Sequence, residues 1–325
     1  MIRRHALPIG LFFLAPLVAE FLLGNLPITL LPALVALAPM YGGGALLIRE
    51  LVRRRGLGWP NIVILGVAYG VLEEGLTTQS LFNPNYADQH LLADGFIPAL
   101  GIAVPWTLFV VGIHVFWSIG APILTMEVIA GERRTTPWLG RTGLIVTGVL
   151  FVIGIAVTTA INQSMWPYTA TAGQLIVTGI IVVLLVGAGL LLRIDLERRP
   201  GNAPSALTVL IATLVAGGLF MGTTLADLPT WVGVAVMVVD VAGYLTLLAR
   251  WSARDGWTEM HYLAVAAGAL LTYAWHSFVE SPTGGAAVAV DLIGNVVFTA
   301  GAIALLWYAY RRVVARQAAV QPELG

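Results

Sequence analysis

Residues 174–192 read QLIVTGIIVVLLVGAGLLL, and residues 193–204 read RIDLERRPGNAP. The first stretch carries no charge over its 19 residues, and an α-helix needs about 20 apolar residues to cross the hydrocarbon core of a bilayer. The second stretch carries three arginines and two prolines. An apolar run of this length that ends at arginines is typical of a membrane-spanning helix.

The same pattern recurs along the chain. Of the 325 residues, 58% are apolar and 10% are charged, and the mean hydropathy is +0.87, which excludes a water-soluble domain. We therefore expect an all-α fold, a polytopic transmembrane helical bundle of about ten spans. It forms a single integral membrane domain (1–325) with a short frayed cytoplasmic tail (317–325). The spans lie near residues 7–24, 26–48, 60–82, 104–129, 142–161, 174–192, 205–222, 229–249, 262–280 and 286–309.

The arginines predict the orientation. All 17 basic residues are arginines, and each lies in an alternate connection: near the N-terminus, in 49–59, 130–141, 193–204 and 250–261, or after 310. The opposite connections carry only Asp88, Asp94 and Asp227 as charges. Because arginine-rich loops stay cytoplasmic, this pattern predicts that both termini are cytoplasmic and that the protein is integral to the plasma (inner) membrane.

Composition also bounds the partners. The 17 basic and 17 acidic residues balance, which argues against nucleic acid as a partner, and without cysteine there is no disulfide or thiolate site. The expected partners are the lipid bilayer and a peptide or small-molecule substrate. The sequence does not decide the structure of 96–129. This stretch contains Pro98, Pro105 and Pro122, which predict either one kinked helix or a helix that follows a short interfacial segment.

Ionisable side chains inside the apolar runs mark the candidate site, because a charge at the bilayer centre costs roughly 2.5–3.5 kcal/mol. Asp240 stands alone in the eighth run, as either a structural hydrogen-bonding residue or a functional one, and Glu127 is close enough to the inner end of its run to reach the interface. The remaining polar residues lie in the middle or outer half of their runs, where they could form one cluster. They are Glu73 and Glu74 in the third run, His114 and Ser118 in the fourth, and His276, Glu280, Asp291 and Asn295 in the last two.

This set of residues suits proton transfer. Adjacent carboxylates in a low dielectric cannot both ionise cheaply, so one of the Glu73 and Glu74 pair is expected to keep a proton. Carboxylates beside histidines can deprotonate a water or carry coupling protons. The same groups are also suitable ligands for a divalent metal, although the sequence requires no cofactor. A purely structural glutamate pair, bonded to neighbouring hydroxyls or amides, is the alternative.

A Glu-Glu pair followed by histidines on later helices resembles the CAAX protease and bacteriocin-processing (CPBP) intramembrane proteases, with the pattern E-E-x-x-x-R, F-x-x-x-H and H-x-x-x-N. The resemblance covers the third to the tenth run. It implies that Glu73 and Glu74 match the pair, and that His114 and His276 match the two histidines. In that family, glutamate and histidine are thought to activate a water against a peptide carbonyl. The sequence departs from the pattern at Thr78, Val110 and Glu280.

Two other functions fit the sequence. A proton-coupled secondary transporter commonly has ten spans and protonatable residues near the midplane, and it resembles drug/metabolite carriers in size and span number only. A non-catalytic membrane partner protein needs no site at all. A protease requires Glu73 or Glu74 within hydrogen-bond reach of a histidine, whereas a carrier requires a cavity open to one side and two pseudo-symmetric halves.

Overall fold

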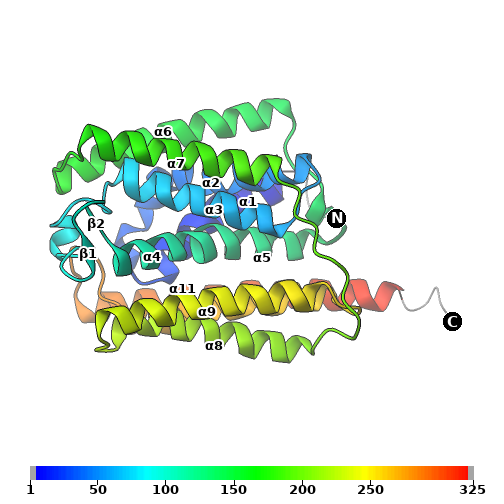
Figure 1. Cartoon of the computed structure of the whole chain (residues 1–325). Coiled ribbons are helices and arrows are strands. Elements are labelled where there is room, and N and C mark those ends of the chain that lie inside the picture. Colours follow the sequence, from blue (N-terminus) through cyan, green and yellow to red (C-terminus); the bar gives the residue numbers. More distant parts are fainter. Residues whose placement is uncertain (1–4, 321–325) are drawn as a thin grey trace.

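The computed structural model describes residues 5–320 and is mostly helical. Ten long helices follow one another (Figure 1). Some change their hydrogen-bond pattern along their length, to π-helix in η1, η3 and η5 and to 3₁₀-helix in η2 and η6. The helices are α1 (Ala6–Pro16) with η1 (Leu17–Leu22); η2 (Ile28–Ala33) with α2 (Leu34–Arg54); α3 (Trp59–Leu72) with η3 (Glu73–Thr77); α4 (Val104–Ile113) with η5 (His114–Gly120), α5 (Ala121–Ala130) and η6 (Gly131–Thr135); α6 (Arg141–Met165); α7 (Ala172–Leu191); α8 (Ala206–Leu225); α9 (Thr230–Ser252); α10 (Glu259–His276); and α11 (Val288–Val320).

The predicted polytopic helical bundle is confirmed, with differences at the ends of elements. The apolar stretch after residue 95 is a short antiparallel hairpin, β1 (Phe96–Ile97) with β2 (Ile102–Ala103), and the fourth helix begins only at Val104. The stretch is therefore a helix preceded by a separate segment. Helix α10 ends at His276, so Glu280 lies beyond it. Helix α11 includes 317–320 of the predicted frayed tail, and 321–325 lie outside the described residues.

The helices form two groups. Helices α1 to α7 make one group, in which α2 packs against α1 and α6, and α3 packs against α7. Helices α8, α9 and α11 lie along the other side of the molecule (Figure 1). Helix α10 joins the groups, because it packs against α8 and α11 and also against α5. Helix α1 begins and α11 ends at the same end of the bundle, as an even number of crossings requires.

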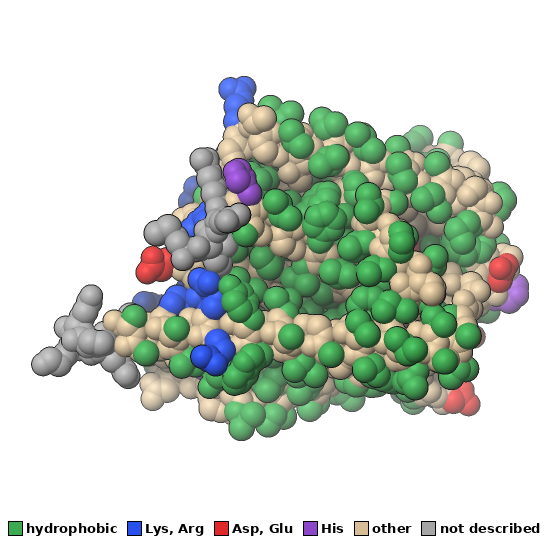
Figure 2. All heavy atoms as spheres, turned by 180° about the vertical axis from the view of Figure 1, so that it is seen from behind, with side chains coloured by type: hydrophobic (Ala, Val, Ile, Leu, Met, Phe, Trp, Pro, Cys, Tyr) green, Lys and Arg blue, Asp and Glu red, His purple; other side chains and the backbone are tan. Residues whose placement is uncertain are grey.

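The outer surface of the bundle is apolar. Among the described residues, seven helices are long and apolar enough to cross a membrane, and in α6, α7 and α9 only 11%, 17% and 6% of the most apolar window is buried. Figure 2 shows apolar side chains in a broad band between two ends, with arginines gathered at one of them. Such a band needs a hydrocarbon solvent, so the protein is an integral membrane protein.

Glycines let α2 approach its neighbours closely. A Cβ atom on Gly42 would lie 1.9 Å from the carbonyl oxygen of Phe12 in α1, and one on Gly154 of α6 would lie 2.4 Å from the backbone nitrogen of Met40. Small residues at such contacts are the usual means of tight helix packing in membranes. The close contact of α1 with α2 also brings Glu20 and Tyr41 together, as described next.

Candidate functional site

Three π-helical segments carry the polar residues of the site. They are η1, η3 and η5, and the described part of the chain contains no other π-helix. Each contributes at least one ionisable side chain: Glu20 from η1, Glu73 and Glu74 from η3, and His114 from η5. Segment η5 packs against both α3 and η1. Because π-helical turns are rare and occur frequently at functional sites, their convergence singles out this region.

His114 lies between the two carboxylates. Its Nε2 atom is 2.7 Å from Oε1 of Glu74, and its Nδ1 atom is 3.3 Å from Oε2 of Glu73. The Oγ atom of Ser118, one turn further along η5, is 3.2 Å from the same Nδ1. All four side chains are buried, with at most 5% of any residue exposed. Four of the predicted residues are thus brought together, away from water.

The two glutamates are held differently. Oε2 of Glu74 accepts hydrogen bonds from the hydroxyl of Thr78 at 3.0 Å and from the hydroxyl of Ser80. The Ser80 hydroxyl in turn accepts a hydrogen bond from Nε1 of Trp106 at 3.2 Å. Oε2 of Glu73 is buried and accepts no hydrogen bond. Glu74 is therefore fixed by its neighbours, whereas Oε2 of Glu73 has only the 3.3 Å contact with Nδ1 of His114 and accepts no hydrogen bond.

Two tyrosines and a further glutamate extend the site. The ring of Tyr41 is stacked on His114 with centroids 6.2 Å apart, and the ring of Tyr69 meets His114 edge-on at 5.8 Å. The Tyr41 hydroxyl donates a hydrogen bond to Oε1 of Glu20 at 2.5 Å, and Nδ2 of Asn25 donates to Oε2 at 2.6 Å. The sequence offered one signal for Glu20, a carboxylate in an otherwise apolar first span, but not its connection to the site.

The other four predicted residues form a second group, where α10 ends and α11 begins. Asn295 donates hydrogen bonds from Nδ2 to the carbonyl oxygen of Ser277 at 2.8 Å and to Oδ1 of Asp291 at 3.3 Å. Nδ1 of His276 lies 3.7 Å from Oε2 of Glu280, and burial raises the pKa of that carboxyl. The structure therefore divides the predicted residues between two groups instead of placing them in one.

Glu73, Glu74 and His114 are arranged in a way that can hold a small ligand. One ligand atom from each lies within 4.8 Å of the others, and no other group of three metal-ligating side chains occurs among residues 5–320. Carboxylate and imidazole are suitable donors for a divalent cation. Glu74, however, already uses both oxygens in hydrogen bonds, and both ring nitrogens of His114 have partners, so a metal or a water bound here has to replace one of these contacts.

Unpartnered polar atoms in both groups also indicate a bound water or ligand. The hydroxyls of Tyr69 and Tyr273 and both ring nitrogens of His276 are buried without a hydrogen bond, in addition to Oε2 of Glu73. Buried polar groups in proteins nearly always have a partner, which is often an ordered water. Several orphaned atoms on helices α3 and α10 and segment η3 therefore point to a polar occupant of this part of the interior.

A separate buried ion-pair network lies at the arginine-rich end. Nε and Nη2 of Arg53 lie 2.8 Å and 2.7 Å from the two carboxylate oxygens of Glu127. Glu127 is 3% exposed, so the prediction that it reaches the interface is wrong. Arg49, which is fully buried, pairs with Glu50 at 2.7 Å and packs on the ring of Trp138. These contacts tie α2 to α5 and to the following connection.

The fold and site together define a polytopic membrane protein with a buried Glu-Glu-His cluster. A protein-family model described as "Uncharacterized membrane protein family" matches residues 11–319, and the chain therefore belongs to this family. No curated protein and no solved structure matches the chain. The family description names no activity, so the resemblance to CPBP proteases stays an expectation from the motif.

Proposed function

We propose that this protein is an intramembrane hydrolase that cleaves a peptide bond with a water activated by Glu73 and His114. It is proposed to act in the plasma membrane, with its arginine-rich end in the cytoplasm. One observation carries the proposal: two carboxylates and an imidazole, each on a π-helical segment, meet within 4.8 Å in a buried site. Such a set is what general acid–base catalysis needs, and burial strengthens its electrostatic interactions.

The geometry suggests a role for each residue. Oε2 of Glu73, which accepts no hydrogen bond, takes a proton from the water while the water oxygen adds to the carbonyl carbon. Glu73 later returns this proton to the leaving nitrogen. His114 stabilises the negative charge on the carbonyl oxygen through Nδ1, which exchanges its contact with Ser118 for the substrate. Glu74 positions His114 through the 2.7 Å contact at Nε2. The unpartnered hydroxyl of Tyr69 beside His114 is a second donor for that oxygen.

The departures from the CPBP pattern fit this assignment in part. Thr78 stands in place of arginine, and its hydroxyl supports Glu74 at 3.0 Å, which makes it a positioning residue. His276 is buried beyond the three-residue group, so the proposed mechanism assigns the imidazole role to His114 alone.

Cleavage in ¹⁸O-labelled water tests the proposal without a known substrate. The full-length protein in liposomes is incubated with a library of apolar peptides, and products are analysed by mass spectrometry. Hydrolysis places one ¹⁸O atom in each new carboxyl group. Glu73→Gln and His114→Ala are expected to lower cleavage by at least 100-fold, in line with the roughly 10²–10⁴-fold contribution of a general acid or base. Glu132→Gln, at an exposed glutamate, is the matched control.

The result that contradicts the proposal is cleavage that persists in both site variants, or no cleavage of any peptide by protein that inserts and folds normally. A chelator distinguishes catalysis by a water that a carboxylate activates from catalysis by a bound metal. Because Glu74 has both oxygens in hydrogen bonds, cleavage is expected to be unchanged by 1,10-phenanthroline. Loss of cleavage that added zinc restores would assign a metal to Glu73, Glu74 and His114.

A proton-coupled carrier is the second candidate, because the bundle contains a cavity of about 850 Å³ between its two groups of helices. The cavity is bordered by residues of the arginine-rich end, such as Arg53 and Arg134. The π-helical segments, however, lie only in the first half of the described chain, without a counterpart at the matching places in the second half. Proton flux into proteoliposomes that depends on an added solute would favour the carrier over the hydrolase.

A further inference from the structure

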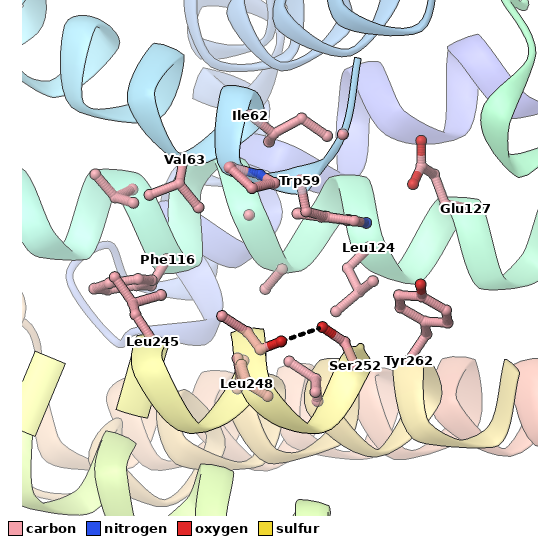
Figure 3. A pocket seen from close by; sticks show the side chains of 18 of the residues that line it. Trp59, Ile62, Val63, Phe116, Leu124, Glu127, Leu245, Leu248, Ser252 and Tyr262 are labelled. Atoms are coloured by element: carbon pink, nitrogen blue, oxygen red, sulfur yellow. Dashed lines mark hydrogen bonds between the residues drawn. The ribbon is translucent and has the colours of Figure 1, made fainter. Parts of the chain in front are cut away.

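The cavity between the two helix groups has the size and lining of a small-molecule site. Its volume of about 850 Å³ falls within the roughly 300–1,000 Å³ that is usual for such sites. Figure 3 shows Trp59, Ile62 and Val63 of α3 on one side and Leu245 and Leu248 of α9 on the other, with Phe116 facing Leu245 between them. Most of the lining is apolar, so the few polar groups in it decide what binds.

Asp240 is the unusual polar group of this lining. It lies at the middle of α9 (Thr230–Ser252) and lines the cavity, and no hydrogen bond or basic partner for its carboxylate occurs within residues 5–320. An unpaired carboxylate at the centre of a membrane helix is costly and usually functional. Its neighbour one turn on, Tyr244, is engaged with the hydroxyl of Thr213 at 2.6 Å and leaves Asp240 alone.

The other acidic residues of the lining do not share this property. Glu127 pairs with Arg53 at 2.7 Å, and Glu259 pairs with Arg316 at 2.7 Å. Asp195 lies in the exposed connection between α7 and α8. Of the carboxylates that line the cavity from within a described helix, Asp240 is thus the one without a cation. The deep part of the cavity therefore holds a carboxyl group with no cation beside it.

Aromatic rings line the same cavity. Phe116 and Trp117 of η5, Phe220 of α8 and Tyr244 of α9 all line the cavity, and Phe220 packs against both Phe116 and Trp117. The faces of aromatic rings attract cations, most strongly where water is excluded. The basic residues at the rim, Arg53 and Arg134, are engaged at the arginine-rich end, with Glu127 and with the ring of Tyr262 respectively, and do not pair with Asp240.

We propose that this cavity binds an organic cation that carries bulky apolar groups, with its positive charge beside Asp240. The apolar walls accommodate the apolar groups of the cation, and the aromatic rings and the carboxylate attract its positive charge. An anion or a neutral lipid chain would leave Asp240 unpaired. The proposal concerns binding only and does not depend on hydrolysis at Glu73.

Two ions of the same shape and opposite charge test the proposal. Tetraphenylphosphonium and tetraphenylborate are each titrated against the purified full-length protein in detergent, with protein-free micelles as the blank. We expect saturable binding of tetraphenylphosphonium at one site and none of tetraphenylborate. Asp240→Asn, which keeps the shape of the side chain, should weaken binding of the cation at least tenfold. Asp227→Asn, at an exposed aspartate between α8 and α9, is the matched control.

A variant that fills the cavity tests the location independently of Asp240. Leu245→Trp adds an aromatic side chain opposite Phe116 (Figure 3) and should weaken cation binding at least tenfold while the carboxylate remains. The proposal is overturned if wild-type protein binds both ions equally or neither ion saturably. It is also overturned if Leu245→Trp, still folded by size-exclusion chromatography, binds the cation as wild type does. Equal binding of the two ions would identify an apolar site for lipid chains.

Discussion

Replacing Glu127 with glutamine should destabilise the bundle strongly, because it leaves a buried arginine without its counter-ion. Arg53 holds both oxygens of Glu127, and Nε of Arg49 lies 3.2 Å from one of them. Two unit charges about 4 Å apart attract by about 4 kcal/mol at an effective dielectric constant of about 20. Removal of one partner from a buried pair costs about 3–5 kcal/mol in measured cases, so the two magnitudes agree.

The free energy of unfolding is measured by titration with SDS in mixed micelles, with tryptophan fluorescence as the readout. Glu132→Gln makes the same chemical change at an exposed glutamate five residues further on and is expected to change stability by less than about 0.5 kcal/mol. The double variant Arg53→Met with Glu127→Leu leaves neither member of the pair charged. It should therefore cost less than Glu127→Gln alone, while Arg49 keeps Glu50 at 2.7 Å.

The reasoning is refuted if Glu127→Gln and Glu132→Gln unfold at the same SDS fraction. It is also refuted if the double variant is the less stable of the two Glu127 variants. In the first case the ion pair adds no more to the free energy of unfolding than a neutral amide does. In the second case the packing of the apolar part of the Arg53 side chain contributes more than its charge.

Two further predictions concern packing and the site. Gly42→Ala should cost about 3 kcal/mol or more, because the new methyl group would lie 1.9 Å from the carbonyl oxygen of Phe12. Gly148→Ala, with no atom within 4 Å, should cause no destabilisation in the same SDS titration. Thr78→Val should lower peptide cleavage about fivefold and leave substrate affinity unchanged, since Glu74 loses one hydrogen bond worth about 1 kcal/mol. Thr78→Ser, which keeps the hydroxyl, should restore cleavage; equal rates in the two Thr78 variants would count against the positioning role.

The spans were predictable because the bilayer imposes a length on them. Runs such as 174–192 match helix α7 (Ala172–Leu191) almost to the residue, and the proline-containing stretch 96–103 was the place where hydropathy alone left two possibilities. The meeting of Glu73, Glu74, His114 and Ser118 was predictable as well, because polar residues in apolar helices need one another.

The division of the site into two groups was not predictable from the sequence. Depth along each helix placed His276 near Glu73, but depth says nothing about the rotation of one helix relative to another. The π-helical segments were hidden for a similar reason: an i→i+5 turn is stabilised by the packing around it and has no local signature. The pairing of Arg53 with Glu127 was missed because both lie near the end of a helix, where a water-exposed position was the simpler expectation.

Segment η5 serves two sites with one turn of backbone. His114 and Ser118 face the carboxylates, while Val115, Phe116 and Trp117 between them line the cavity. Protein interiors are close-packed and transmit small displacements, so a molecule that presses on Phe116 is expected to shift the imidazole of His114, two residues away in the chain. Compounds that bind only in the cavity are therefore candidates for inhibitors of the buried Glu73–Glu74–His114 cluster.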